Sequence, residues 1–328
     1  MKKIVSFFGD KSEIFCNLND RAREYAKSLG IEYRWAPQLP FSEECVIKEL
    51  QNADAGIIDI EPYGESIFSQ IKDRAKLLVR FGVGYDKVDL KAASTNGIAV
   101  ARTTGANTTA VAEMALTLML SCRRRISKYQ ARAKAGEWVK DIGNEIIGGT
   151  VGIIGYGCIG RRLAKLLKGF DCRILAFDPF PNKEAMEADG VELVSLEEVF
   201  CQADAISIHV PYTEQTHHMV NRETLAMMKP TAVIVNTARG NIIDEDALYE
   251  ALKSDRIAGA GVDVFATEPL PVDSPLLTLN NAVITPHVSS QTVESLWNIY
   301  KMAIDISADF FAGKDSLHIL NQDYKEHA

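Results

Sequence analysis

The stretch Val151-Gly152-Ile153-Ile154-Gly155-Tyr156-Gly157-Cys158-Ile159-Gly160 decides the fold. An apolar run typical of a buried strand leads into the pattern G-x-G-x-x-G, and a helical pattern follows over 159–168. Gly155 permits a tight turn, Gly157 lets the backbone approach a pyrophosphate, and Gly160 lets the helix pack closely on the strand. The free N–H groups at the start of the helix then face phosphates. The stretch therefore predicts a dinucleotide-binding strand–turn–helix unit.

Asp178 directly follows the next predicted strand, 173–177. It stands 18 residues after Gly160. A carboxylate at this place can accept hydrogen bonds from the adenosine ribose. It would repel the 2′-phosphate of NADP by up to ~4 kcal/mol at about 4 Å and an effective dielectric of 20. The sequence therefore predicts NAD as the cofactor.

On both sides of this stretch, short apolar strands alternate with helices. Further strands are predicted at 3–8, 31–35, 55–60, 76–80, 205–210, 232–236, 259–263 and 282–285. Such alternation indicates parallel sheets with helices on both faces, so the fold class is α/β with two doubly wound domains. A long helix is predicted over 107–125, and we interpret Arg123-Arg124-Arg125 as charge at its C-terminal end. From 128 to 149 the hydrophobic periodicity is weak, and no strand or helix is predicted there.

Length and composition agree with this organisation and exclude other classes. A chain of 328 residues has room for about two domains. Its net charge of −8 disfavours non-specific nucleic-acid binding. The longest apolar stretch, 110–120, is too short to cross a bilayer, and the run 4–8 is too short for a secretory signal. Six scattered cysteines without a Cys-x-x-Cys pair favour a reducing cytoplasm.

Reactive side chains follow three of the predicted strands. Arg239 comes directly after a buried strand, and its planar guanidinium suits a carboxylate. Glu268 and His287 follow the next two strands, and Pro286 restricts the backbone immediately before the histidine. Because ligands of open α/β sheets bind beyond the carboxyl ends of the strands, these side chains are expected to converge on one cleft.

In these residues and in several other motifs, the chain resembles the D-isomer-specific 2-hydroxyacid dehydrogenases. Besides the glycine fingerprint, the motifs that carry the resemblance are RFGVGYDKVD (80–89), NTTAVAE (107–113), HVP (209–211), NTARG (236–240), EPLP (268–271) and PHVS (286–289). They occur in the family's order from about residue 80 to the last predicted helix. The first ~75 residues match only in pattern.

The resemblance implies a discontinuous architecture. Residues 1–104 and 289–328 would form a flavodoxin-like substrate-binding domain, into which a Rossmann NAD-binding domain, 105–288, is inserted. It also implies a homodimer with the helix 107–125 in the contact. The partner would be a small 2-hydroxy or 2-keto acid, with no nucleic acid and no membrane.

The resemblance also implies roles for individual residues. Arg239, Glu268 and His287 would be catalytic: Arg239 binds the substrate carboxylate, His287 exchanges a proton with the substrate oxygen, and Glu268 orients the imidazole. Arg80 and the N–H groups of Val83 and Gly84 would also bind substrate. The cofactor would contact Thr108, Gly155, Gly157, Cys158, Ile159, Gly160, Asp178, His209, Val210, Pro211, Thr237, Ala238 and Asp263. No step requires a metal.

The substrate stays open at this point. 3-Phosphoglycerate, glyoxylate, hydroxypyruvate and branched 2-keto acids all fit the motifs. The same scaffold also serves NAD(H)-sensing corepressors, which act by binding proteins, so a binding function is the alternative to an enzyme.

Overall fold

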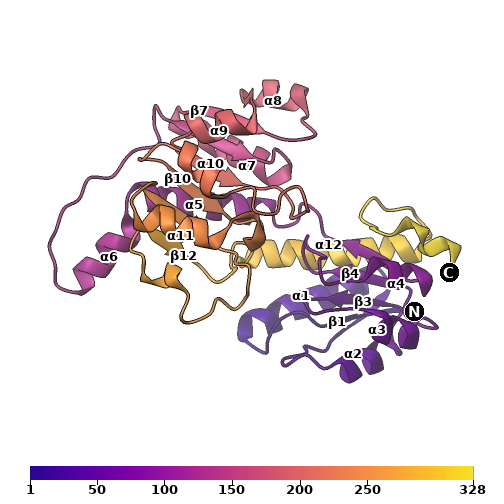
Figure 1. The fold of residues 1–328 in the computed structure, drawn as a ribbon. Helices are drawn as coiled ribbons and strands as arrows, with labels where there is room; N and C mark the ends of the chain where they lie inside the picture. The colour runs from indigo at the N-terminus through magenta and orange to yellow at the C-terminus, as the bar shows by residue number, and fades with distance from the viewer. Residues whose placement is uncertain (328) are drawn as a thin grey trace. The chain divides into compact units, whose positions relative to one another are not determined.

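The computed structural model describes residues 1–327 and divides into two compact units (Figure 1). Unit 1 comprises Met1–Asn107 and the residues from Thr292 onward, and unit 2 comprises Thr108–Gln291. Each unit is a parallel sheet with helices on both faces. This confirms the α/β class predicted from the alternation of strands and helices. The breaks between the units lie close to the boundaries expected after residues 104 and 288.

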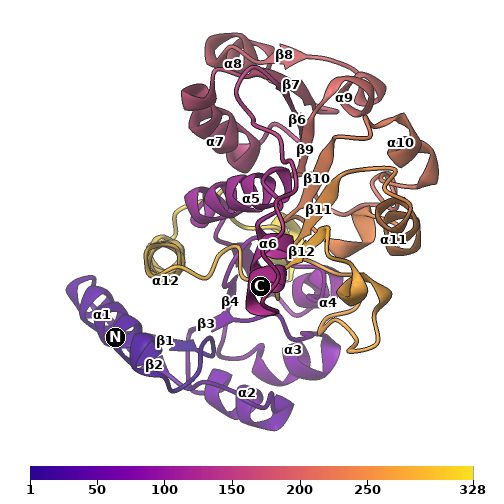
Figure 2. The same cartoon turned by 90° about the vertical axis from the view of Figure 1, so that its left-hand side faces the viewer.

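Unit 1 is built on five parallel strands in the order β2-β1-β3-β4-β5, the flavodoxin-like order. The strands are β1 (Lys2–Ser6), β2 (Ile31–Trp35), β3 (Ala55–Ile58), β4 (Leu77–Arg80) and β5 (Ala99–Arg102). Helices α1 (Glu13–Ser28) and α12 (Val293–Phe311) cover one face. Helices α2 (Glu43–Leu50), α3 (Glu65–Ile71) and α4 (Leu90–Thr95) cover the other (Figure 2), and the 3₁₀ turn η4 (Gln322–Glu326) packs on α4.

Successive side chains along each strand of unit 1 point to opposite faces of the sheet, and they fill a hydrophobic core on each face. Ile4, Ile57 and Leu77 point toward α1 and α12, and their sequence neighbours point toward α2 and α3. These side chains are fully buried, which is what a sheet covered on both faces requires. Ser42 caps α2 through a hydrogen bond from Cys45 N, as its position before the helix predicts.

Unit 2 is built on seven parallel strands in the order β12-β11-β10-β9-β6-β7-β8. The strands are β6 (Thr150–Ile154), β7 (Arg173–Phe177), β8 (Glu192–Leu193), β9 (Ala205–Ile208), β10 (Val233–Asn236), β11 (Gly259–Val262) and β12 (Ala282–Ile284). Helices α5 (Thr108–Arg123), α7 (Cys158–Leu167) and α8 (Lys183–Asp189) cover one face. Helices α9 (Leu196–Gln202), α10 (Arg222–Met227) and α11 (Glu245–Lys253) cover the other. Short 3₁₀ turns are η1 (Lys168–Phe170), η2 (Gly240–Ile242) and η3 (Pro275–Thr278).

The strand order of unit 2 reverses between β6 and β9, and the glycine-rich turn lies at this point. Gly155 has φ +98°, and a Cβ there would lie 2.8 Å from the backbone carbonyl carbon of His209. A Cβ at Gly160 would overlap the carbonyl oxygen of Gly155. Gly157, by contrast, faces open space. The first and third glycines therefore allow β6, β9 and α7 to pack, and the second leaves room beside the turn.

The segment after α5 differs from the prediction. The predicted helix over 107–125 ends at Arg123, and after Arg125, whose φ is 54°, a second helix α6 (Ile126–Lys134) begins. Arg123 does more than carry charge at a helix end. Its buried guanidinium donates to the carbonyl oxygens of Asp204 and Thr231, both at 3.2 Å, and of Glu145 at 2.5 Å. It therefore joins the end of α5 to loops of the same unit.

None of the helices in residues 1–327 combines the length and the apolar character that a membrane-spanning helix requires.

Candidate active site

Three neighbouring strands of unit 2 carry the three predicted catalytic residues beyond their carboxyl ends. Arg239 follows β10, Glu268 lies in the loop after β11, and His287 follows β12. The register aligns Asn236 of β10 with Val262 of β11, and Val262 with Ile284 of β12. The structure therefore brings the loops that carry these residues to one edge of one sheet.

His287 and Glu268 are in direct contact. The imidazole Nδ1 lies 2.8 Å from the carboxylate Oε2, and Glu268 Oε1 accepts the N–H of Phe265 at 3.0 Å. An ionised carboxylate only accepts hydrogen bonds, so Nδ1 carries the proton in this pair. Within residues 1–327, Nε2 of His287 has no hydrogen-bond partner, and 44% of the side chain is exposed. The contact therefore leaves Nε2 as the atom that can exchange a proton with a ligand.

A buried carboxylate holds the loop that carries His287. Asp263 is fully buried, and its Oδ1 accepts the hydroxyl of Thr285 at 2.6 Å and the N–H of Val288 at 2.9 Å. Its Oδ2 accepts the N–H of Ser289 at 2.9 Å and the hydroxyl of the same serine at 2.5 Å. Its backbone carbonyl oxygen accepts the N–H of His287 at 2.8 Å. Asp263 therefore ties the end of β11 to the residues on both sides of His287.

This network compensates for an unusual backbone conformation. His287 has φ 53°, in the left-handed region that non-glycine residues rarely adopt. Such a conformation costs about 1–3 kcal/mol and persists only where the surroundings enforce it. The hydrogen bonds to Asp263 provide that enforcement, so the imidazole direction is set by the backbone as well as by Glu268.

Arg239 is positioned by the turn that follows β10. Asn236 Nδ2 donates to the carbonyl oxygen of Arg239 at 2.9 Å, and Asn236 Oδ1 accepts the N–H of Ala238 at 3.0 Å. The Arg239 guanidinium donates to the carbonyl oxygen of Ala238 at 2.7 Å, and the side chain is half-buried. Gly240 lies so close to the Phe265 backbone that a Cβ would overlap it. The Arg239 turn is thus packed against the loop that leads to Glu268.

The same edge of the sheet has the features that a dinucleotide needs. Gly157 presents open space at the N-terminus of α7. Asp178, beyond β7, accepts the N–H groups of Tyr156 at 2.7 Å and Phe180 at 2.8 Å, one on each carboxylate oxygen. This arrangement fixes the carboxylate and leaves further lone pairs for ribose hydroxyls. Thr237 Oγ1 is buried without a hydrogen-bond partner in the described chain, as expected of a group whose partner is a ligand.

The other predicted cofactor residues of unit 2 are also placed by this sheet. Burial lowers the pKa of His209 to about 4, and its Nε2 lies 2.9 Å from the Ser207 hydroxyl, so this histidine is neutral near pH 7. The remaining positions stand at the ends of elements: Thr108 begins α5, Cys158 and Ile159 begin α7, Val210 and Pro211 follow β9, and Ala238 follows β10.

The predicted substrate residues of unit 1 follow β4. Gly82, with φ 122°, is held by Thr103, whose hydroxyl accepts the Gly82 N–H at 2.9 Å. The next two N–H groups, those of Val83 and Gly84, have no acceptor within residues 1–327. Arg80 is buried, donates to the carbonyl oxygen of Phe81, and lies 3.8 Å from the Asp59 carboxylate. These contacts hold the Arg80 side chain at the loop, and its binding of substrate stays a prediction.

The sequence alone does not reveal the residues that hold the loop of His287. It assigns no role to Thr285 or Ser289, and it places Asp263 at the cofactor only. A signal was available: hydroxyl side chains stand two residues before and two residues after His287. Hydroxyl side chains in loops commonly hydrogen-bond within the loop, although the spacing does not identify Asp263 as the acceptor.

A family model, related sequences and solved structures all match this chain, and they agree on one family. Residues 116–289 match the family model described as "D-isomer specific 2-hydroxyacid dehydrogenase, NAD binding domain". The chain is 36% identical to a glyoxylate reductase of Korarchaeum cryptofilum over 88% of this chain and 89% of that protein. It resembles the solved structure of a D-2-hydroxyisocaproate dehydrogenase with a TM-score of 0.88 and 30% identity, over 97% of this chain and 99% of that one.

A longer relative matches as well. The chain is 36% identical to a D-3-phosphoglycerate dehydrogenase of Archaeoglobus fulgidus over 86% of this chain, but it spans only 54% of that protein's length.

The role of Asp263 is testable by substitution. Asp263→Ala removes the acceptor of four donor contacts and should lower the free energy of unfolding by about 2–4 kcal/mol. Asp263→Asn should cost nearly as much, because its NH₂ group would face N–H or O–H donors. Urea denaturation measures both, and Asp273→Ala, an exposed position in the same unit, is the control. A loss below about 0.5 kcal/mol in both variants would contradict the role.

Proposed function

The chain belongs to the D-isomer-specific 2-hydroxyacid dehydrogenase family, and from this premise we propose that it interconverts a D-2-hydroxy acid and its 2-keto acid with NAD as the cofactor. The observation that carries the proposal is the His287–Glu268 pair at 2.8 Å, at the same sheet edge as Arg239 and the glycine-rich turn. An acid–base group, a cation for a carboxylate and a dinucleotide turn are the parts that this reaction needs.

The proposed chemistry divides between cofactor and protein. When bound, NADH would supply the hydride that reduces C2 of the keto acid. His287 donates a proton from Nε2 to the keto oxygen as the hydroxyl forms, and it accepts that proton back in the oxidation direction. Glu268 keeps Nδ1 protonated and stabilises the charged imidazole. Arg239 binds the substrate carboxylate through its planar guanidinium.

We propose that unit 2 is the NAD-binding domain and that unit 1 contributes to substrate binding. The cofactor's pyrophosphate would lie on the N-terminus of α7 beside Gly157, and Asp178 would accept the ribose hydroxyls. In unit 1, the N–H groups of Val83 and Gly84 have no protein acceptor and are suited to a carboxylate oxygen. Two adjacent N–H groups on a glycine-rich turn form a small anion-binding nest.

For the substrate we propose glyoxylate or hydroxypyruvate. The support is the glyoxylate reductase that the chain matches over nearly all of both proteins. 3-Phosphoglycerate is the second candidate, because a D-3-phosphoglycerate dehydrogenase matches 86% of the chain.

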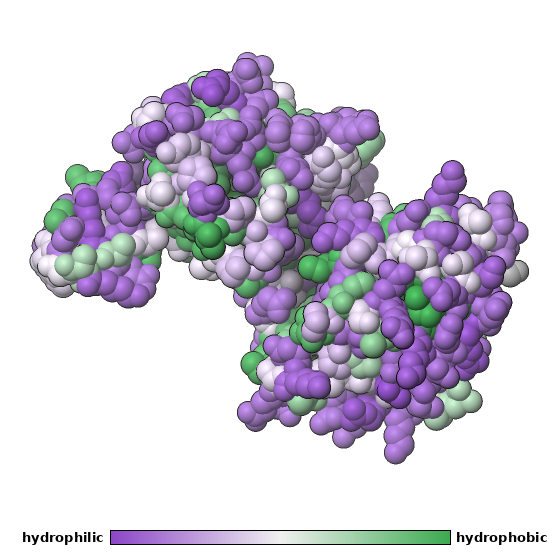
Figure 3. All heavy atoms as spheres, turned by 60° about the horizontal axis from the view of Figure 1, so that its bottom comes forward, coloured by the Kyte–Doolittle hydropathy of each residue, from purple (hydrophilic) through white to green (hydrophobic). Residues whose placement is uncertain are grey.

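We also propose that the protein is a homodimer, and that its contact includes residues 126–147 of unit 2, here called the arm, next to the helix 107–125 implied by the resemblance. Ile126, Trp138, Val139, Ile142 and Ile147 are all more than half exposed, and Trp138 is 89% exposed. Figure 3 shows hydrophobic surface among the hydrophilic residues of this projecting segment. Ion pairs within the arm nonetheless hold it together: the Asp141 carboxylate lies 2.8 Å from Lys128 Nζ and 2.9 Å from the Arg132 guanidinium. An ordered segment with this much exposed apolar surface is typical of an interface.

The substrate assignment predicts the outcome of a panel assay. Oxidation of NADH, with NADPH in parallel, is followed against glyoxylate, hydroxypyruvate, phosphohydroxypyruvate, pyruvate and 2-ketoisocaproate. We expect the highest kcat/KM with glyoxylate or hydroxypyruvate, and a preference for NADH because of Asp178. A preference for phosphohydroxypyruvate would support the second candidate. Tight NADH binding without turnover on any acid would favour the sensor alternative.

The role of His287 predicts a loss of turnover without a loss of cofactor. His287→Asn should lower kcat/KM by about 10²–10⁴-fold, because the variant has no group that can donate the proton. Glu268→Gln should fall between this variant and the wild type, since an amide still accepts from Nδ1 but carries no charge. NADH affinity, from fluorescence titration, should be unchanged in both. His318→Asn in unit 1 is the control, and near-wild-type rates for His287→Asn would exclude the proposed role.

The dimer proposal predicts that charge on the arm separates the subunits. The double variant Trp138→Asp/Ile142→Asp should have the molar mass of a monomer in size-exclusion chromatography with light scattering, because each subunit would bury two carboxylates in the interface. The wild type should have the molar mass of a dimer. Leu317→Asp, an equally exposed apolar position in unit 1, should stay dimeric. A monomeric wild type, or a double variant that stays dimeric, would refute the assignment.

A further inference from the structure

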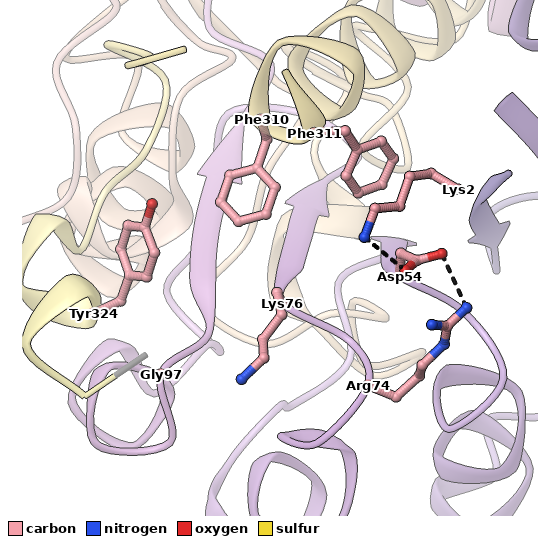
Figure 4. A pocket seen from close by; sticks show the side chains of 8 residues that line it. All are labelled: Lys2, Asp54, Arg74, Lys76, Gly97, Phe310, Phe311 and Tyr324. Atoms are coloured by element: carbon pink, nitrogen blue, oxygen red, sulfur yellow. Dashed lines mark hydrogen bonds and ion pairs between the residues drawn. The ribbon is translucent and has the colours of Figure 1, made fainter. Parts of the chain in front are cut away.

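Unit 1 contains a pocket of about 280 Å³ at the amino ends of its strands (Figure 4). Lys2 begins β1, and Asp54 and Lys76 immediately precede β3 and β4. Val83 and Gly84 follow the opposite end of β4. The pocket is therefore distinct from the substrate loop of the same unit, and no part of the proposed reaction uses it.

The charges around the pocket do not balance. Three cationic side chains line it, those of Lys2, Arg74 and Lys76, against the single carboxylate of Asp54. Asp54 is held by the Lys3 N–H at 2.8 Å and pairs with Lys2 and Arg74, each at 3.1 Å. These contacts keep the pKa of Asp54 below its ordinary value despite its burial, so the group is ionised near pH 7. The lining therefore carries an excess of two positive charges.

Lys76 accounts for much of this excess. It forms no ion pair within residues 1–327, and its ammonium points away from Asp54 (Figure 4). The side chain is half-buried where it enters the pocket. An ammonium that lines a pocket with two other cationic side chains, and has no carboxylate of its own, is a favourable partner for an anion.

The opposite wall is aromatic. Phe310 and Phe311, the last residues of α12, line the pocket together with Tyr324 of η4. The rings of Phe310 and Tyr324 lie 6.2 Å apart, and the Lys2 ammonium lies 5.6 Å from the centre of the Phe311 ring. Aromatic faces beside fixed cations suit a ligand with a flat apolar body and a charged end.

We propose that this pocket binds a small organic dianion that has an aromatic or other flat apolar body. The charged end would replace solvent at the Lys76 ammonium, and the apolar body would lie against Phe310 and Tyr324. The Asp54 pairs hold two of the cations in place before the ligand arrives, which reduces the ordering that binding requires. The inference rests on unit 1 alone and does not depend on the proposed reaction.

Phenyl phosphate is a suitable probe, because it combines a dianion with an aromatic ring. Calorimetric titration of the full chain at low ionic strength, in the presence of saturating NADH, should show saturable binding. Inorganic phosphate, which lacks the ring, and benzyl alcohol, which lacks the charge, should both bind more weakly. Equal affinity for inorganic phosphate and phenyl phosphate would contradict the role of the aromatic wall.

Substitutions locate the binding. Lys76→Gln should weaken phenyl phosphate binding about tenfold, the loss of one charge-assisted contact, and Lys76→Arg should retain it. Lys72→Gln removes an exposed cation of the same unit outside the pocket lining and should leave the affinity unchanged. An unchanged melting temperature shows that Lys76→Gln is folded. Absence of binding to the wild type, or equal binding by Lys76→Gln, would overturn the proposal.

Discussion

Parallel pairing of the strands in unit 2 is the constraint on which the site depends. Because seven strands run in one direction, the loops that leave their carboxyl ends meet at one edge. The sheet thereby brings the glycine-rich turn, Asp178, Arg239, Glu268 and His287 together, although they are spread over more than 130 residues of sequence. Helices buried on both faces hold the strands in register, so the positions of these loops follow from packing far from the chemistry.

Fine positioning within that edge comes from buried polar groups. A buried carboxylate without partners would be strongly unfavourable, but Asp263 has four donor contacts, and two of them come from N–H groups directly after His287. The same hydrogen bonds enforce a left-handed backbone at the histidine. Stability and the geometry of the proposed catalytic pair are therefore coupled here: a change that relaxes the Asp263 network would also release His287 from its contact with Glu268.

Sequence reasoning predicted what local pattern and spacing determine. The α/β class and the strands at 31–35 and 173–177 follow from hydrophobic periodicity. It did not predict the helix 126–134, which buries none of its residues and so has no apolar stripe facing a core. It also missed the burial of Arg123 and the donors around Asp263, because these contacts join residues 22 to 108 positions apart. Only the folded chain brings such partners together.

Hydride transfer to C2 is the central claim, and isotope labelling tests it most directly. The wild-type protein is incubated with hydroxypyruvate and NADH that carries deuterium at both C4 positions of the nicotinamide. The glycerate formed is then examined by mass spectrometry and chiral chromatography. The account predicts D-glycerate with one deuterium at C2, because the hydride comes from the cofactor while the proton on oxygen comes from His287. L-glycerate, or glycerate without deuterium at C2, would contradict it.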